Sequence, residues 1–387
     1  MGQENPFVYG EIVTAGAFAD REAERERLAR DLAEGQKVFL ISPRRYGKSS
    51  LVRDVLRGLA RQRILTVEVT VAASSSYVGF LEAYARALVT ADTPIGRLRR
   101  WTTELLQAVR PELRFDGPSP GGPSAGGGVT LAFPAVRTAR DTARLAAEVF
   151  ALPGRIAAAR RQRLAIALDE FQAVVSFDGG NVEHALRAAV QDQRAVGYVF
   201  AGSEPSLMER MLEPRRPFYK AGPVMRLEKI DEELFAHFIE SRFAASGLKP
   251  EPGLGAAIVE LAGNVPYDVQ RLAHETWDDV RVAGRKSAGL DDLHGTLTRL
   301  LGEHHTAFEE SWQRLTLAQR AVLRALVLED GRELMSGDVR TRHRLPGASS
   351  VQSALAALLR QDVVMKTGSR YTVSDSLYRE WVARKTF

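Results

Sequence analysis

The fold is decided by residues 37–50, which read KVFLISPRRYGKSS. Residues 37–41 are an apolar run typical of a buried strand, and apolar positions spaced along residues 47–61 predict an amphipathic helix. A short loop ending in Gly47-Lys48-Ser49 lies between them. A strand that ends abruptly, a loop with inward-pointing N–H groups and a helix N-terminus together make a phosphate site. The stretch therefore predicts a P-loop.

The residue types in this loop predict ATP with magnesium. Lys48 would neutralise the β- and γ-phosphates, and the Ser49 hydroxyl would ligate Mg²⁺. Ser42 departs from the usual G-x-x-x-x-G-K-[S/T] pattern because it replaces the first glycine, which bears on hydrolysis rate more than on binding. The alternative is a chance Gly-Lys-Ser on a surface turn. The residues expected to hold the nucleotide are Ser42, Pro43, Arg44, Arg45, Tyr46, Gly47, Lys48, Ser49 and Ser50.

A second motif strengthens the first. Residues 164–170 read LAIALDE, an apolar strand that ends in two carboxylates. Asp169 would lie beside the phosphate loop and hold the magnesium through its water shell. Glu170 would orient and polarise the attacking water as a general base. An apolar strand ending in Asp-Glu is a weak signal alone, but after a phosphate loop it predicts an ATPase that forms ADP and phosphate.

The rest of the N-terminal region predicts an α/β fold. Residues 64–71 read as a strand and residues 77–89 as a helix, so strands and helices alternate as in a parallel sheet with crossover helices. The stretch 117–128 is almost entirely Gly, Pro, Ser and Ala between two strand-like segments. It predicts a hairpin inserted at about residues 110–134.

The remainder of the chain predicts two further domains. From Asp231 onward the pattern is almost wholly helical, and near residue 315 short helices lead into two strands, 363–366 and 370–373. Helices followed by a β-hairpin predict a winged helix-turn-helix. The expected fold is an α/β P-loop NTPase core with a parallel sheet, a helical lid and a winged helix. The expected domains are residues 1–230, residues 231–314 and residues 315–387.

Two more residues are candidates for sensing the γ-phosphate. Ser203 follows the strand at residues 197–202 and could reach the γ-phosphate or the attacking water, the role called sensor 1. Its alternative role is to cap a helix over residues 204–212. Arg271 follows a break at residues 263–266 and could reach the phosphates from the lid, the role called sensor 2. A solvent-exposed or ion-paired arginine is the alternative.

An ordered set of short motifs resembles the archaeal-type P-loop ATPase family, within the AAA+ and STAND group. The set covers nearly the whole chain: 5–7 (NPF), 18–24 (FADREAE), 43–49 (PRRYGKS), 169–170 (DE), 202–203 (GS), 217–219 (PFY), 263–266 (GNVP) and 371–378 (YTVSDSLY). The resemblance implies an ATPase core, a helical lid and a winged helix.

The resemblance also implies roles for individual residues. The segment around Phe18 and Arg21 would line the adenine pocket, although Asp20 stands where relatives usually have glycine. In AAA+ relatives an arginine of a neighbouring subunit completes the site, and Arg215 or Arg216 lies in a suitable region. Either arginine could instead be a surface charge.

The winged helix could contact duplex DNA with little sequence discrimination. Ser349 or Ser350 would cap a recognition helix ending near Gln361, whose exposed side offers few groups for reading bases. The alternative is a packing or protein-docking module. The residues expected to meet DNA are Arg340, Arg342, Arg344, Gln352, Lys366 and Arg370.

Composition sets the remaining limits. The chain has 387 residues, a formal charge of +5 and no cysteine. Disulfides and thiolate metal sites are thereby excluded, and a cytoplasmic location is expected. The sequence has neither a membrane-length apolar run nor the pattern of a signal peptide at its start.

The leading hypothesis is a nucleotide-driven switch or motor, coupled to DNA and able to form homo-oligomers or bind a protein on ATP. One alternative is a nucleotide-gated signalling or assembly scaffold with weak hydrolysis. Another is a DNA-binding regulator whose ATPase fold is structural.

Overall fold

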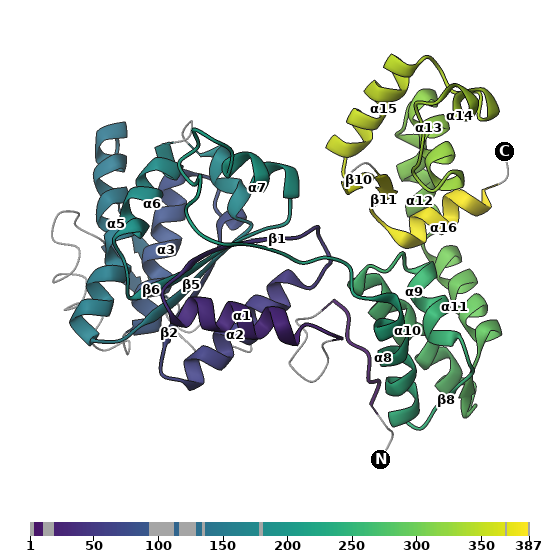
Figure 1. Cartoon of the computed structure of the whole chain (residues 1–387), viewed down its shortest axis with the longest axis horizontal. Coiled ribbons are helices and arrows are strands. Elements are labelled where there is room, and N and C mark those ends of the chain that lie inside the picture. Colours follow the sequence, from purple (N-terminus) through teal and green to yellow (C-terminus); the bar gives the residue numbers. More distant parts are fainter. Residues whose placement is uncertain are drawn as a thin grey trace. The chain divides into compact units, whose positions relative to one another are not determined.

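The computed structural model describes residues 4–10, 19–92, 112–115, 129–133, 136–177, 181–367 and 370–385. The chain divides into two compact units (Figure 1). One contains residues 14–228, and the other contains residues 229–387 together with residues 1–13. We call them the core unit and the C-terminal unit.

The core unit is built on a five-stranded parallel sheet. Its strands are β1 (Lys37–Ile41), β2 (Leu65–Thr70), β5 (Leu164–Asp169), β6 (Val196–Gly202) and β7 (Val224–Arg226). Their order, β2-β5-β6-β1-β7, places β1, which precedes the phosphate loop, between β6 and β7, and places β5 beside β6.

Helices cover both faces of this sheet (Figure 1). The central strands β1, β5 and β6 are buried on both sides. Alternate residues of β1 therefore pack in opposite directions: Val38 and Leu40 join one apolar cluster, and Phe39 and Ile41 join the other. The first cluster includes α1 (Glu22–Ala33) and α2 (Lys48–Arg61). The second includes η2 (Val71–Ala73), α3 (Tyr77–Asp92), α5 (Ala139–Arg160), η4 (Phe171–Ser176), α6 (Asn181–Gln191) and α7 (Pro205–Met211).

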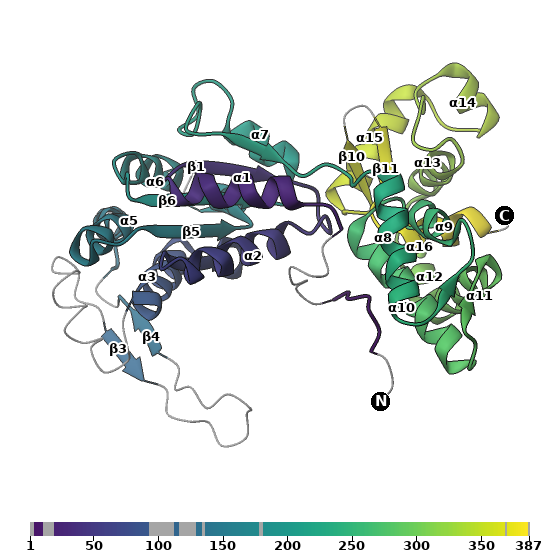
Figure 2. The same cartoon turned by 60° about the horizontal axis from the view of Figure 1, so that its bottom comes forward.

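The predicted hairpin is present in the core unit (Figure 2). Strands β3 (Glu112–Phe115) and β4 (Val129–Ala132) pair antiparallel, with Glu112 opposite Ala132. The Gly- and Pro-rich tip predicted at 117–128 lies outside the described residues. Two regular strands on either side of a turn-rich stretch are the pattern that predicted this element.

The C-terminal unit begins with helices and ends in a winged helix. Its helical part contains α8 (Glu232–Ala245), β8 (Lys249–Pro250), α9 (Leu254–Leu261), α10 (Pro266–Val282), β9 (Ser287–Ala288), α11 (Leu290–Glu303) and α12 (His305–Gln313). The winged-helix part contains α13 (Leu317–Leu328), α14 (Gly337–Arg342), α15 (Ala348–Arg360), β10 (Val364–Thr367), β11 (Arg370–Val373) and α16 (Ser376–Arg384). The two strands of the wing pair antiparallel, Val364 with Val373. Helix α16 joins the two parts, since Arg379 donates to the carbonyl of Leu261 over 3.0 Å.

The N-terminal segment, residues 4–10, packs on the helical part of the C-terminal unit, although the predicted core domain starts at residue 1. Phe7 is only 2% exposed and its ring lies 4.8 Å from that of Phe243. The Tyr9 hydroxyl donates to Glu275 over 2.6 Å, and this bond is the largest cause of raising the pKa of Tyr9 to about 12. Asn5 donates to Asp278 over 2.8 Å. The segment is too short for a periodic pattern, so its partner could not be inferred from the sequence.

The packing of Phe7 leads to a stability prediction. Phe7→Ala is expected to lower the free energy of unfolding of the C-terminal unit by about 3 kcal/mol, because a buried aromatic ring is removed and a cavity is left. Tyr9→Phe, which removes one hydroxyl, should lower it by only about 1 kcal/mol. Urea unfolding followed by tryptophan fluorescence measures both. If the two variants lower the free energy of unfolding equally, the Phe7 ring does not contribute the packing that is proposed for it.

Two helix ends differ from those that the sequence predicts. The sequence pattern predicts one helix over residues 182–196, but α6 ends at Gln191, because Val196 starts β6 and pairs with Leu164 in the sheet. The caps expected at Ser349 and Ser350 are also wrong, because α15 begins at Ala348 and its N-cap residue is Gly347. Among the described residues, no helix combines the length and apolar character needed to cross a membrane.

Candidate nucleotide site

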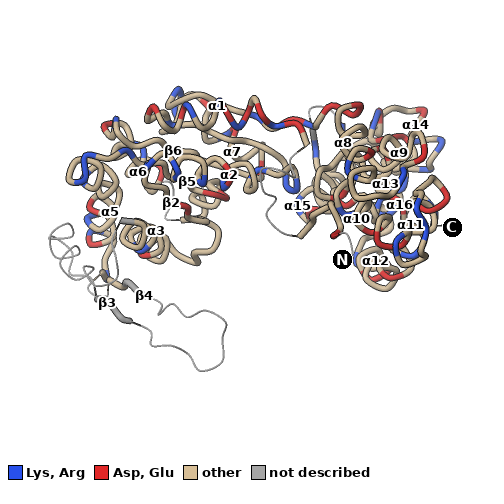
Figure 3. The backbone as a smooth tube through the Cα atoms, turned by 90° about the horizontal axis from the view of Figure 1, so that it is seen from below, with Lys and Arg blue, Asp and Glu red and all other residues tan. Residues whose placement is uncertain are grey.

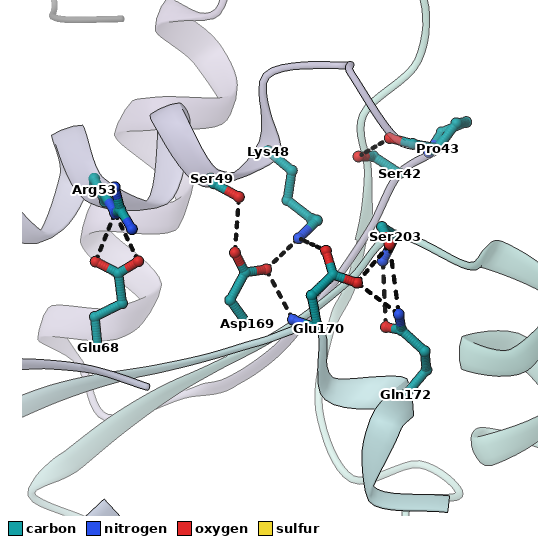
Figure 4. Close-up of polar contacts among 10 residues, drawn as sticks. All are labelled: Ser42, Pro43, Lys48, Ser49, Arg53, Glu68, Asp169, Glu170, Gln172 and Ser203. Atoms are coloured by element: carbon teal, nitrogen blue, oxygen red, sulfur yellow. Dashed lines mark hydrogen bonds and ion pairs between the residues drawn. The ribbon is translucent and has the colours of Figure 1, made fainter. Parts of the chain in front are cut away.

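The phosphate loop starts where β1 ends, between two neighbouring strands. The Ser42 backbone N–H continues the ladder by donating to Gly202 over 3.2 Å. Ser42 is 1% exposed, and its hydroxyl donates to the carbonyl of Pro43 over 3.0 Å. The hydroxyl of the residue that replaces the usual glycine is therefore satisfied inside the loop itself (Figure 4).

The left-handed residues of the loop are Arg45, with φ 70°, and Gly47, with φ 82°. Gly47 is the N-cap of α2, and a Cβ added there would meet nothing within 4 Å, so backbone conformation and not space favours glycine. Left-handed residues within a turn direct successive N–H groups into an anion-binding concavity. A non-glycine residue in this region costs on the order of 1 kcal/mol and is typical of functional loops. The side chain of Tyr46 is buried, which raises its pKa.

Lys48, Ser49 and Asp169 meet at the carboxyl edge of the sheet, although about 120 residues separate the loop from Asp169 (Figure 4). Lys48 Nζ forms an ion pair with Asp169 Oδ1 and lies 3.5 Å from Glu170 Oε1. Ser49 Oγ donates to Asp169 Oδ2 over 2.7 Å. The side chains of Lys48 and Asp169 are 5% and 10% exposed. The Asp169 carboxylate thus contacts both the buried ammonium of Lys48 and the hydroxyl of Ser49.

This donor set fits a magnesium nucleotide. Hydroxyl and carboxylate oxygens are the ligands that Mg²⁺ takes from proteins, while nucleotide phosphates and water complete its shell. The only buried ammonium of the loop lies beside these oxygens, where a phosphate would balance its charge. The residues are therefore compatible with both ligands.

Glu170 directly follows Asp169 and adopts a left-handed conformation, with φ 53°. Its Oε2 accepts a hydrogen bond from the Ser203 hydroxyl over 2.5 Å. The alternative role of Ser203 as a helix cap is wrong, because the N-cap of α7 is Glu204 and the helix starts at Pro205. Gln172 also contacts Glu170 and is not among the residues predicted from the sequence. Its only signal in the sequence is one amide among apolar residues just after Asp-Glu.

Of three other predicted residues, the structure describes Arg21 and Arg271. Arg21 is 7% exposed and donates to Glu24 and to the carbonyl of Glu228, each over 2.6 Å. Phe18 lies outside the described residues. Arg271 lies in the C-terminal unit, with its guanidinium 2.5 Å from His304 Nε2. The roles at the adenine and as sensor 2 stay predictions.

Two of the predicted DNA-contacting arginines, Arg342 and Arg370, pair with acidic residues. Basic and acidic residues are interspersed along the C-terminal unit (Figure 3). Glu329 is 2.7 Å from Arg342 and 2.6 Å from His343, and these partners lower the pKa of Glu329, with His343 the larger cause. Asp330 forms an ion pair with Arg370, which lowers the pKa of Asp330. Arg340 donates to the carbonyl of Met335.

The other predicted contacts differ in their surroundings. Lys366 lies 5.4 Å from the ring centre of Tyr371. Arg344 and Gln352 are exposed. Since the acidic partners stand in a turn after α13, their pairing with these arginines had no sequence signal.

Comparison with known proteins supports the fold. A family model described as "Probable winged helix domain" matches residues 306–384. No protein with curated annotation matches the chain. A Walker-type ATPase of Pyrococcus abyssi superposes with a TM-score of 0.58 at 15% identity, covering 95% of this chain and 97% of that chain.

Two proteins of Aeropyrum pernix are also similar. ORC2, in a structure of its ADPNP-ADP complexes, has a TM-score of 0.54 at 14% identity, with 98% of this chain and 95% of that chain covered. ORC1, in complex with DNA, has a TM-score of 0.52 at 16% identity, with 94% and 92% covered. At these identities the likeness shows fold. The predicted P-loop NTPase core with a C-terminal winged helix is confirmed, and so is the resemblance at the level of fold.

Proposed function

We propose that this chain binds Mg-ATP at residues 42–50 and hydrolyses it to ADP and phosphate. The observation that carries the proposal is the meeting of Lys48, Ser49 and Asp169 at one point, with Glu170 beside them. Buried clusters of this composition at the carboxyl edge of a parallel sheet fit triphosphate chemistry, in which positioning and electrostatics supply most of the catalysis.

Each residue has a distinct role in this proposal. Ser49 and Asp169 would hold Mg²⁺, which when bound neutralises charge on the phosphate oxygens. Lys48 neutralises the β- and γ-phosphates, and the loop amides cradle them. The oxygen of a water forms a bond to the γ-phosphorus while the bond from that phosphorus to the bridging oxygen of ADP breaks. Glu170 accepts the proton of the water, and Ser203 holds the Glu170 carboxylate in place.

The proposed output is a nucleotide-driven switch or motor that acts on duplex DNA. Residues 315–387 contain 12 Lys and Arg and 7 Asp and Glu, which gives this part a formal charge of +5. The formal charge of the whole chain is also +5, so the excess is carried entirely by the winged-helix part. A basic module attracts the phosphate backbone of DNA. Assembly into oligomers on ATP, with Arg215 or Arg216 reaching a neighbouring site, belongs to the same proposal.

A second candidate function is a nucleotide-gated scaffold whose winged helix binds protein. Two observations favour it. Glu329 and Asp330 already pair with Arg342 and Arg370. Leu317 and Leu328, the first and last residues of α13, are 82% and 53% exposed and are accessible to a protein partner.

ATP turnover by the purified chain, with and without duplex DNA, tests the proposal. We expect turnover that depends on Mg²⁺ and rises when duplex is added. Turnover that is unchanged by DNA would support the ATPase activity and would favour a winged helix that binds protein. Absence of both turnover and Mg-ATP binding would remove the ATPase and leave a structural role for the fold.

Duplex binding by the winged helix should be electrostatic. The double variant Arg342→Ala/Arg344→Ala is expected to weaken binding about tenfold at low salt and to reduce the slope of log affinity against log salt by about 2, since each lost phosphate contact removes about 1. Arg314→Ala is the matched control, because the Arg314 side chain is 80% exposed and lies outside the predicted contacts. Fluorescence anisotropy of a labelled duplex measures both quantities. A double variant that binds like Arg314→Ala would contradict the predicted surface.

A further inference from the structure

Gln172 connects the two polar residues that flank the proposed point of water attack (Figure 4). Its Nε2 donates to Glu170 Oε2 over 2.6 Å and to Ser203 Oγ over 3.4 Å. Its Oε1 accepts from the Ser203 backbone N–H over 3.3 Å. The Ser203 hydroxyl itself donates to the same oxygen of Glu170 over 2.5 Å. The three residues therefore form a closed triangle of hydrogen bonds.

The surrounding structure fixes this amide in place. Gln172 is 5% exposed and lies in η4, whose first residue, Phe171, is fully buried against Phe200 with ring centres 4.6 Å apart. A Cβ added at Gly202 would come within 2.9 Å of Gln172 Oε1, so the end of β6 approaches this amide as closely as glycine allows. The position is therefore tightly determined by its neighbours.

The chemistry of the amide matches both partners. A carboxylate can only accept hydrogen bonds and a backbone N–H can only donate, and glutamine offers one group of each kind. The Glu170 side chain is 28% exposed, so packing alone does not hold its carboxylate in one orientation. Without the amide, only the Ser203 hydroxyl and the Lys48 ammonium would restrain the rotamer of this carboxylate.

We propose that Gln172 is a positioning residue for hydrolysis: it holds the Glu170 carboxylate, together with Ser203, at the orientation needed to accept the proton of the attacking water. This inference rests on the proposed ATPase function. Gln172 acts through Glu170 and does not touch the phosphates. Its removal should therefore slow the chemical step and leave Mg-ATP affinity unchanged, because misplacing a catalytic group by about 1 Å can cost on the order of 100-fold in rate.

The test compares Gln172→Met and Gln172→Asn with Gln193→Met. Methionine keeps the length and burial of glutamine but removes all three of these hydrogen bonds, whereas asparagine keeps the amide on a shorter side chain. Gln193 is the matched control, since it is equally a buried glutamine of the core unit, 8% exposed, and donates to the Phe150 carbonyl over 2.7 Å at the opposite end of the strands. For each variant, phosphate release gives kcat, titration gives the Kd of Mg-ATP, and thermal unfolding gives Tm.

The expected result is a selective loss of turnover. Gln172→Met should lower kcat roughly 10- to 100-fold with Kd changed less than about 2-fold, and Gln172→Asn should recover part of that loss. Gln193→Met should lower Tm and keep kcat. In a Glu170→Gln background, Gln172→Met should cause no further loss, because both changes act on one group.

Other results would overturn the inference, and they are distinguishable from failure of the proposed function. Wild-type kcat in Gln172→Met and Gln172→Asn, or a loss of kcat in Gln193→Met that matches its loss of Tm, would assign Gln172 a purely structural role while the ATPase stands. If the wild-type chain binds Mg-ATP but does not turn it over, hydrolysis itself fails, and the inference about Gln172 falls with it.

Discussion

Lys48→Met is expected to reduce the affinity for Mg-ATP at least about 100-fold, because charge-assisted hydrogen bonds to phosphate are among the strongest polar contacts and no other buried cation of the loop replaces it. The same change should destabilise the core unit by about 3 kcal/mol, since it leaves Asp169 buried without its cation. Calorimetric titration with Mg-ATP and urea unfolding measure the two effects.

The chain provides a matched control at the start of β1, the strand that precedes the phosphate loop. Lys37 is a partly buried lysine at the start of β1, and its ammonium donates to the carbonyls of Gly35 and Gln193. Burial lowers the pKa of Lys37. Lys37→Met should therefore destabilise the core unit as well, while Mg-ATP affinity stays at the wild-type value. Equal loss of affinity in both variants would mean that Lys48 acts only through stability.

A second substitution separates binding from stability. In Lys48→Met/Asp169→Asn the buried carboxylate is neutralised together with its cation, so much of the lost stability should return. Nucleotide affinity should not return, because the contact to phosphate and the oxygen ligand proposed for magnesium are both gone. Wild-type affinity in Lys48→Met would show that the loop is not the nucleotide site.

The sequence predicted the central geometry because that geometry follows from strand ends. Apolar runs located β1 and β5, and the parallel sheet brings their carboxyl ends to one edge, so Lys48 and Asp169 meet across about 120 residues. The fold class followed from the same alternation of strands and helices. The apolar runs of the buried strands and the Gly-Lys-Ser and Asp-Glu motifs that follow them carried these predictions.

Other features depend on contacts that leave no periodic trace. The packing of Phe7 against Phe243 joins residues far apart in the chain through a segment of a few residues. The pairing of Glu329 with Arg342 depends on a turn, and the contact of Gln172 with Glu170 depends on a left-handed backbone at Glu170. Local sequence patterns do not encode such details, because tertiary packing selects them after the main elements are in place.

Glu170→Gln is expected to lower turnover by about 10²- to 10⁴-fold while Mg-ATP binding is kept, because an amide preserves the size of the side chain but cannot accept the proton of the attacking water. Binding should persist because Lys48, Ser49 and Asp169 are unchanged, and Lys48 then has one fewer carboxylate beside it.

Glu68→Gln is the control for this change. Glu68 is another partly buried glutamate of the core unit, with both oxygens within 2.8 Å of Arg53 Nε, and it is separate from the Lys48 cluster in Figure 4. Its substitution should keep turnover near the wild-type rate. Single-turnover phosphate release and nucleotide titration distinguish the possibilities: if Glu170→Gln and Glu68→Gln hydrolyse ATP equally fast, the proton is accepted elsewhere, and the hydrogen-bonded triangle around Glu170 has only a structural role.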